Sequence, residues 1–374
     1  MRIFCLSLFV WLMTANSVFA QSLADDLITN ADEVIATQVV DPVKMYGLAG
    51  YYNEVRVLRV TDGKVATLKP GGHSFSANEW LAISGRYNVL TVQGEGIRLN
   101  LSEDNSLQFT DLKALRAAKI DILRSDELTT LDPSLKSIRY SHLVLPIRFL
   151  CKILDWLMLQ IQALLGNWGL SIIAIALVIK IALLPLGLLV KRFQDDVSKT
   201  QVAMAPRLAE IKKTLKGEAA HKAFVAAHKE QGVTTFYALK PMIGLVVQIP
   251  VWIAIFNVLA EIPQMAGHGF LWVKDFAYPD ALYTWRGAIP LVGNTLNLMP
   301  ILMTLVTIIS TLTFRDNHAT VDILKKQKRN LFFMATAFLI LFYPFPSGMV
   351  FYWMLANLSN FGQQLWLARD KKTA

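Results

Sequence analysis

The sequence has few charged residues for its length. Asp, Glu, Lys and Arg make up 17% of its 374 residues, whereas a soluble globular domain carries about 25%. Hydrophobic residues make up 54% and the mean hydropathy is +0.40, which excludes an intrinsically disordered chain. The net charge of +9 is concentrated beside long apolar runs. This placement favours a membrane protein over a DNA-binding protein.

Cysteine is also scarce. Cys5 and Cys151 are too few for a disulfide framework or a zinc site built from cysteines. Cys5 lies in a segment with a positively charged start, an apolar core and the small residues Val18 and Ala20, which is the pattern of a signal peptide over residues 1–20. An uncleaved anchor helix is the alternative. Both interpretations place the following segment outside the cytoplasm.

Residues 21–140 are predicted to form a small β-rich domain. Residues 54–60 alternate in polarity, Asp62-Gly63 is a tight-turn pair, and residues 64–68 can return as a second strand. The domain lacks a His/Asp/Ser cluster and a glycine-rich phosphate loop, so we expect no catalytic residues, no metal and no cofactor. Further elements are predicted over residues 87–92 and 97–101, as strands, and 112–123, as a short helix.

The rest of the chain has helical spacing. Residues 145–165, within a segment 141–166, carry an apolar stripe typical of an amphipathic helix on a membrane surface. Packing of this stripe against the β-rich domain is the alternative. Five apolar segments follow, each close to the length that spans a bilayer. They cover residues 167–190, 239–262, 289–314, 331–345 and 348–367.

The connecting loops differ in basic residues. Ten Lys and Arg residues lie between the first and second segments, five follow the third, and three lie in the tail, residues 368–374. The connections on the other side contain only Lys274 and Arg286. The positive-inside rule therefore places the tail in the cytoplasm and the β-rich domain outside. The sequence predicts a multi-span α-helical membrane protein with a five-span core, residues 167–367, plus a small exported β-rich N-terminal domain.

The cytoplasmic stretch 191–239 is predicted to be a helical hairpin. Its helices are expected over residues 197–216 and 218–231, with Gly217 between them. It carries ten basic residues, counting Lys240, and five acidic ones. A basic hairpin could contact ribosomal RNA or anionic lipid headgroups. A solvated face that simply obeys the positive-inside rule is the alternative.

Lys180 is the only charged residue between Asn167 and Val190. A charge at the centre of a span costs about 2.5–3.5 kcal/mol on insertion scales, so such a residue usually faces a polar cavity. The interiors of the other four segments contain no Asp or Glu, because Glu261 lies at an outer end. We therefore expect water, polar side chains or a transient ligand to solvate Lys180.

Polar and aromatic side chains on the other segments are candidates to share this cavity with Lys180. Together they predict a hydrophilic groove that opens to the cytoplasm, while ordinary hydrogen bonding between helices is the alternative for each amide. The candidate groove residues are Lys180, Gln248, Tyr352, Trp353, Asn357, Asn360 and Gln363.

Several separated motifs resemble the YidC-type membrane insertases, the family of the mitochondrial oxidase-assembly and chloroplast thylakoid insertases. The resemblance covers residues 141–367 and includes the order of spans, the hairpin and the amphipathic helix. Lys180 stands where the family usually has arginine. The motifs are Asn167–Ile173, Gln248–Pro250, Phe270–Asp275 and Phe345–Trp353.

The resemblance implies a non-enzymatic insertase and chaperone of the bacterial inner membrane. Its groove would receive the hydrophilic tail of a nascent integral membrane protein while the apolar segment moves into lipid. The ribosome and the Sec translocon are further partners that the resemblance implies. Two alternatives stay open: an assembly factor or scaffold for one envelope complex, and a secondary transporter. A transporter usually has an inverted repeat and an acidic relay, and we see neither in the sequence.

Overall fold

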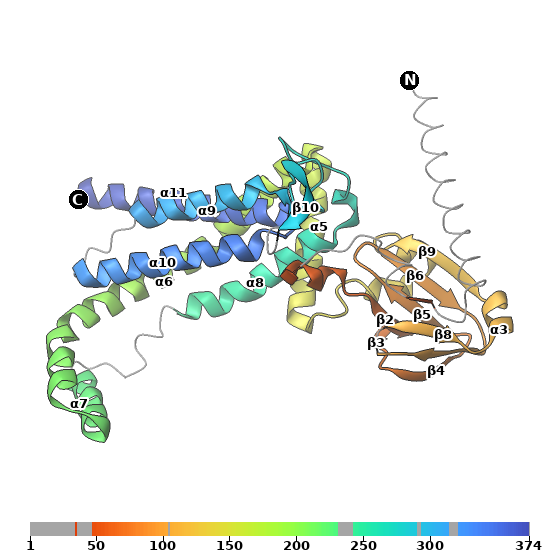
Figure 1. The fold of residues 1–374 in the computed structure, drawn as a ribbon, viewed down its shortest axis with the longest axis horizontal. Coiled ribbons are helices and arrows are strands. Elements are labelled where there is room, and N and C mark those ends of the chain that lie inside the picture. The colour runs from red at the N-terminus through yellow and green to blue at the C-terminus, as the bar shows by residue number, and fades with distance from the viewer. Residues whose placement is uncertain are drawn as a thin grey trace. The chain divides into compact units, whose positions relative to one another are not determined.

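The structure, a computed structural model, describes residues 34–35, 47–103, 105–230, 242–289, 293–313 and 321–373. The chain divides into two compact units (Figure 1). The first consists of Met1–Arg148 with Ala260–Ala266, and the second of Phe149–Leu259 with Gly267–Ala374. The predicted signal peptide lies outside the described residues.

The first unit is β-rich, as predicted, and contains two antiparallel sheets. Their strand orders are β1-β8-β7-β4 and β3-β2-β5-β6-β9. The strands are β1 (Val34–Ile35), β2 (Arg56–Thr61), β3 (Lys64–Thr67), β4 (Gly71–Phe75), β5 (Glu79–Ser84), β6 (Asn88–Gln93), β7 (Ile97–Leu101), β8 (Ser106–Phe109) and β9 (Lys119–Arg124). The short helices are η1 (Gly47–Asn53), α3 (Leu112–Ala117), α4 (Leu128–Leu131), η2 (Pro133–Ser137) and η4 (Pro263–Met265).

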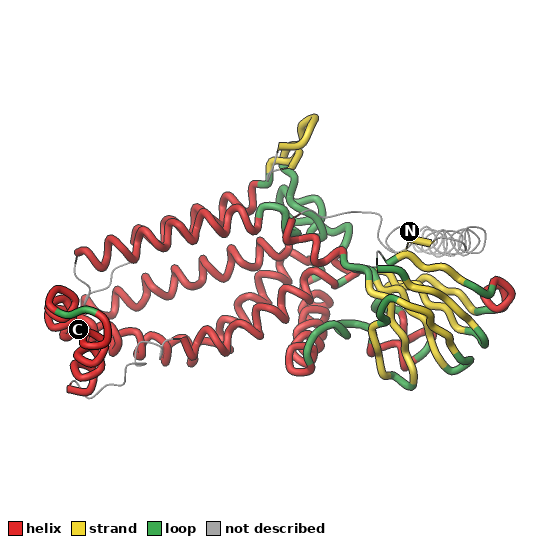
Figure 2. The backbone as a smooth tube through the Cα atoms, turned by 60° about the horizontal axis from the view of Figure 1, so that its bottom comes forward, coloured by secondary structure: helices red, strands yellow, loops and turns green. Residues whose placement is uncertain are grey.

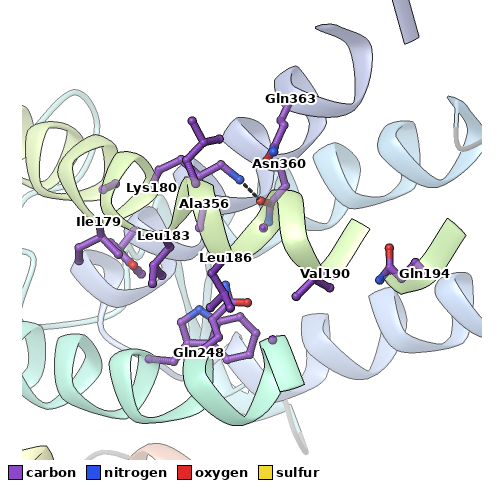
Figure 3. A pocket seen from close by; sticks show the side chains of 16 residues that line it. Ile179, Lys180, Leu183, Leu186, Val190, Gln194, Gln248, Ala356, Asn360 and Gln363 are labelled. Carbon is purple, nitrogen blue, oxygen red and sulfur yellow. Dashed lines mark hydrogen bonds between the residues drawn. The ribbon is translucent and has the colours of Figure 1, made fainter. Parts of the chain in front are cut away.

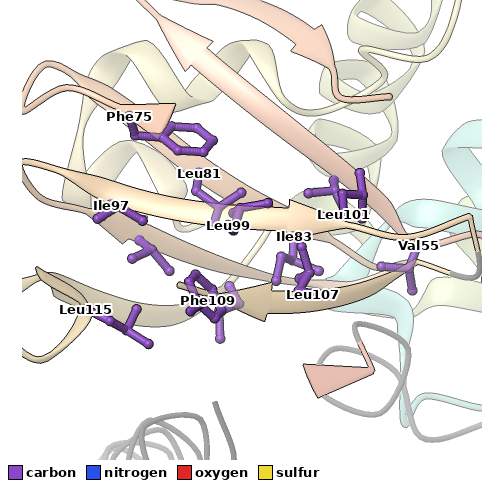
Figure 4. Packing of buried hydrophobic residues seen from close by; sticks show 13 residues of the cluster. Val55, Phe75, Leu81, Ile83, Ile97, Leu99, Leu101, Leu107, Phe109 and Leu115 are labelled. Atoms are coloured by element: carbon purple, nitrogen blue, oxygen red, sulfur yellow. The ribbon is translucent and has the colours of Figure 1, made fainter. Parts of the chain in front are cut away.

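The five-stranded sheet is buried on both faces. Leu81 and Ile83 of β5 belong to the core that this sheet shares with the four-stranded sheet (Figure 4). Trp80 and Ala82 belong to a second core, which includes Leu128 of α4. Successive side chains of a strand point to opposite faces, so a strand covered on both faces is apolar throughout. For this reason β5 lacks the alternation that reveals a half-buried strand.

The β-rich unit confirms one local prediction and corrects another. Asp62 and Gly63 have φ angles of 49° and 75° and join β2 to β3 in a tight turn, as predicted. The helix predicted over residues 112–123 is wrong in its second half, because α3 ends at Ala117 and β9 begins at Lys119. β9 pairs with β6 along its whole length, so sheet pairing overrides the helical pattern there.

A carboxylate at the end of the second predicted span belongs to the β-rich unit. Glu261 lies 3.5 Å from a guanidinium nitrogen of Arg56 and 3.5 Å from the imidazole of His142. Arg86 Nε donates a hydrogen bond of 2.7 Å to the Ala260 carbonyl oxygen. Glu261 is buried, and a buried carboxylate needs such partners to offset its desolvation. These contacts pack Ala260 and Glu261 within the β-rich unit.

The helical part of the chain makes up most of the second unit (Figure 1). α9 packs against α10 and α11, α11 packs against α6, and α7 folds back on the far end of α6. A two-stranded hairpin, β10 (Tyr283–Ile289) and β11 (Gly293–Leu296), precedes α9. The helices are α5 (Leu145–Leu165), α6 (Trp168–Thr214), α7 (Gly217–Glu230), α8 (Met242–Glu261), α9 (Leu298–Thr313), α10 (Val321–Phe342) and α11 (Ser347–Thr373).

Many large apolar side chains of these helices are exposed. On α6, Ile181 is 69% exposed, whereas Ile172 and Ile175 are fully buried in the bundle. The segment Trp168–Val197 is the one stretch of the described chain that is both long and apolar enough to cross a membrane. Val246–Glu261 and Leu298–Thr313 are shorter apolar helices. Each predicted span overlaps a helix, and the five-span core stays a prediction.

Two predicted boundaries differ from the structure. The first helix of the predicted helical hairpin, residues 197–216, is not a separate helix. α6 runs without interruption from the first predicted span into it, past Pro185 and Pro206. The third span does not begin at residue 289, because Ile289 is the last residue of β10 and α9 begins at Leu298. Gly293 has a φ of 79°, a conformation that a helix does not contain.

Candidate functional site

A polar cavity with a volume of about 360 Å³ lies between α6, α8 and α11 (Figure 3). It contains five of the seven predicted groove residues, and its other lining is mostly apolar. None of the described residues that line it is Asp or Glu. Its polar side chains are Lys180 and Gln194 of α6, Gln248 of α8, and Tyr352, Asn360 and Gln363 of α11.

Lys180 and Asn360 point toward each other across the cavity (Figure 3). Lys180 Nζ donates a hydrogen bond to Asn360 Oδ1. An ammonium group has three donors and no acceptor, so this single amide satisfies part of its capacity. Lys180 is partly exposed, and Asn360 is exposed. The partner of this ammonium group is a neutral amide, and none of the described residues that line the cavity is a carboxylate that could neutralise it.

A close approach of two helices borders the cavity. Gly244 of α8 faces Val190 of α6, and a Cβ added at Gly244 would lie 2.2 Å from a Val190 methyl carbon. Any larger residue at position 244 would push the helices apart, so glycine permits this contact. α6 carries Lys180, Gly187 and Gln194 at intervals of seven residues, which places them along one face. This seven-residue spacing from Lys180 could have identified Gln194, which was not among the predicted groove residues.

Trp353 was predicted in the groove, but it lies in an aromatic cluster and does not line the cavity. Its ring centroid is 4.9 Å from that of Trp252, 5.4 Å from that of Phe342 and 5.5 Å from that of Phe256. Trp252 lines the cavity as well, so the cluster forms part of its wall. Such aromatic packing stabilises the bundle and fixes the shape of the wall.

Asn357 was also predicted in the groove and is likewise absent from the lining. Its Nδ2 donates a hydrogen bond of 3.2 Å to Thr307 Oγ1 of α9. Asn357 therefore links α11 to α9 by a hydrogen bond between helices, which was the alternative to a groove role for each amide. Within the described ranges, no group of His, Cys, Asp and Glu side chains has the arrangement of a metal site.

These features define a class of protein. Bundled helices with exposed apolar side chains, and one cavity lined by amides and a cation, are typical of helical membrane proteins whose cavity handles polar groups. Two comparisons with known proteins make the assignment specific. The family model described as "60Kd inner membrane protein" matches residues 160–374. The chain belongs to this family of inner membrane proteins.

Several relatives that match the chain are named as insertases. "Membrane protein insertase YidC" of Janthinobacterium sp. (strain Marseille) is 33% identical over 220 residues, which is 58% of this chain and 36% of the relative. The protein of the same name from Herminiimonas arsenicoxydans is 32% identical over 224 residues, 59% of this chain and 37% of the relative. The match thus spans little more than a third of the length of these relatives.

A solved structure is also similar. "Active YidC insertase crystal structure with the first transmembrane domain resolved" aligns with a TM-score of 0.42 and 13% identity, and the alignment covers 83% of both chains.

Proposed function

We propose that this protein inserts integral membrane proteins into the bacterial inner membrane and helps them to fold. The cavity between α6, α8 and α11, with its one cation and no carboxylate in its described lining, is the observation that carries the proposal. Membership of the 60Kd inner membrane protein family and the names of the matching relatives support it. The action needs no covalent chemistry and no cofactor.

The proposed mechanism lowers the cost of moving a polar segment into the bilayer. A charged or polar tail in hydrocarbon loses its hydration, and this loss is the main barrier to insertion. The amides of Gln248, Asn360 and Gln363 replace part of that hydration, and Lys180 attracts acidic groups. The apolar segment of the client then moves along the exposed apolar side of the bundle into lipid. The cavity acts as a groove that opens to the cytoplasm and to lipid.

We define the helical arm as residues 191–214 of α6 together with α7. Buried Met204 and Ile211 of α6 pack against Ala227 of α7, so the arm has its own small core. We propose that its basic surface meets the ribosome that carries the client, with the Sec translocon as a further partner. Phosphate groups of RNA attract such a surface by counterion release.

We further propose five spans, with the β-rich unit outside and the C-terminus in the cytoplasm. Cysteines introduced at Ser74, which is exposed on β4, and at Thr373, at the end of α11, should react with a membrane-impermeant maleimide from opposite sides. The native Cys151 is buried and should give little background. Labelling of both positions in intact cells, or of neither, would contradict this topology.

A crosslink from the cavity tests the function directly. A photo-crosslinking amino acid at position 180 should capture a ribosome-bound nascent membrane protein, because the client tail occupies the cavity during insertion. The same group at Ile181, which is 69% exposed on the neighbouring face of α6, is the matched control and should crosslink mainly to lipid. Capture of one stable protein, and of no nascent chain, would favour the assembly-factor alternative.

A further inference from the structure

The hairpin of β10 and β11 extends from the bundle at the N-terminal end of α9 (Figure 2). Its side chains are largely uncovered: Leu282 is 48% exposed, Tyr283 64%, Ile289 52% and Leu296 36%. Apolar and aromatic groups exposed this far usually contact a lipid or a partner protein.

The hairpin is amphipathic at its base. Tyr283 lies opposite Leu296, and Thr284 lies opposite Thr295. Directly opposed residues of an antiparallel pair share a face, and neighbouring residues of one strand point to opposite faces. One face of the base therefore presents Tyr283 and Leu296, and the other presents the two threonines. We call these the aromatic face and the threonine face.

Polar contacts fix the base of the hairpin to the bundle. Asn297 accepts a hydrogen bond of 3.2 Å from the Ala281 amide and donates one of 2.7 Å to the Tyr343 carbonyl oxygen. The Tyr343 hydroxyl donates to the Thr295 carbonyl oxygen at 3.0 Å. These bonds tie the base of both strands to the turn between α10 and α11. The hairpin is thus held in one orientation relative to the bundle.

The composition of the hairpin suits a membrane surface. Residues 281–296 contain no acidic residue and one basic residue, Arg286, which is exposed. Tyr and Trp are enriched where headgroups meet acyl chains, and Trp285 follows Tyr283 on β10. α9 continues from the hairpin with exposed Leu305, Ile309 and Leu312. In the proposed topology these three side chains contact lipid, so the hairpin lies at the outer end of a lipid-facing helix.

We propose that the β10–β11 hairpin binds the outer surface of the bilayer. Its aromatic face enters the boundary between headgroups and acyl chains, and Arg286 contacts a lipid phosphate. This inference rests on the proposed membrane topology and goes beyond it. It gives the protein a second anchor in the outer leaflet, outside the span helices.

Depth-dependent fluorescence quenching tests the proposal. Single cysteines at Tyr283, Thr284 and Ile309, in a Cys5→Ser, Cys151→Ser background, are labelled with an NBD dye. The proteins are placed in nanodiscs of phosphatidylcholine and phosphatidylglycerol, with or without lipid that carries a nitroxide near the headgroup. We expect quenching at 283 to be about twofold stronger than at 284, because the two positions point to opposite faces. Position 309 is the reference for lipid contact of the bundle.

The outcomes separate the two proposals. A second set of nanodiscs carries the nitroxide at mid-chain and serves for position 309. Quenching at 309 in this set, without quenching at 283 by the headgroup nitroxide, would overturn the hairpin proposal and leave the span proposal intact. No quenching at 309 would overturn both. Equal quenching at 283 and 284 would overturn the assignment of the aromatic face.

Two further measurements test the contact with lipid. Arg286→Glu should weaken quenching at 283 in nanodiscs with phosphatidylglycerol and have a smaller effect in phosphatidylcholine alone. Unchanged quenching would overturn the phosphate contact. The second measurement is the accessibility of position 283 to aqueous iodide. If position 283 is protected from iodide only in native membrane vesicles and is not quenched by nitroxide lipid, a protein covers the hairpin. This result would overturn the lipid assignment.

Discussion

Lys180→Ala is expected to reduce insertion of clients with acidic translocated tails by about tenfold, with a much smaller effect on clients with neutral tails. Two unit charges 4 Å apart attract by about 4 kcal/mol at an effective dielectric constant of 20. Lys180 is partly exposed, so screening by solvent reduces this to about 1–2 kcal/mol, which corresponds to about tenfold. Insertion assays with paired acidic-tail and neutral-tail clients measure the difference.

Charge variants sharpen this prediction. Lys180→Arg should retain activity, because the charge and the donors remain. Lys180→Glu should be worse than alanine for acidic tails and should spare clients with basic tails. Electrostatic attraction in the cavity predicts this order of effects, whereas a simple loss of packing does not.

The hydrogen bond from Lys180 to Asn360 offers a matched control. If Lys180 acts mainly as a brace between α6 and α11, Asn360→Ala should lower thermal stability and insertion as much as Lys180→Ala, for every client alike. If the charge is what matters, Asn360→Ala keeps it and should preserve the preference for acidic tails. Equal losses for both clients, together with a lower melting temperature in both variants, would refute the electrostatic mechanism.

Asp280→Ala should lower the free energy of unfolding by about 3–4 kcal/mol, the largest effect that we expect on stability. Asp280 is buried, and its Oδ2 accepts hydrogen bonds from the Leu298 amide at 2.8 Å, the Met299 amide at 2.9 Å and Trp272 Nε1 at 3.0 Å. The carboxylate thus caps the N-terminus of α9, where it also interacts favourably with the helix dipole. Alanine would leave buried donors without a partner.

Thermal unfolding in detergent, followed by tryptophan fluorescence, measures this effect. Asp280→Asn keeps an acceptor but loses the charge, and should cost about 1 kcal/mol. Asp196→Ala removes an exposed carboxylate from α6 and is the control for loss of charge alone. A melting temperature of Asp280→Ala equal to that of the control would show that the cap does not hold α9 in place.

The sequence revealed strongly periodic elements better than buried or short ones. α5 follows from its apolar spacing and α8 from the length of its apolar segment, whereas β5 was missed because a sheet covered on both faces removes the alternation. β11 and the last residue of β10 were taken into the third predicted span, because residues 289–292 continue the apolar run of α9 towards the N-terminus, although the hairpin is exposed. Hydropathy reports on the environment of a segment and not on its backbone conformation.

The cavity was only partly predictable for a related reason. Lys180 could be identified because no carboxylate accompanies it in the spans. On α11, however, Tyr352 and Asn360 line the cavity while Trp353 and Asn357 do not. Adjacent residues of a helix point about 100° apart, and the sequence alone does not say which of two neighbouring polar faces meets the other helices. Contacts of α11 with α6 decide this, and they exist only in the folded bundle.

The continuity of α6 has a mechanical consequence. Its 47 residues extend for roughly 70 Å from the bundle to the end of the arm. A helix resists twisting, so a torque applied to the arm is transmitted to the part of α6 that carries Lys180. Pro185, five residues beyond that lysine, and Pro206 in the arm both interrupt the hydrogen-bond ladder, so α6 bends most easily near these two residues. A ribosome bound to the arm, as proposed above, would therefore transmit force along α6 to the groove without contacting the groove itself.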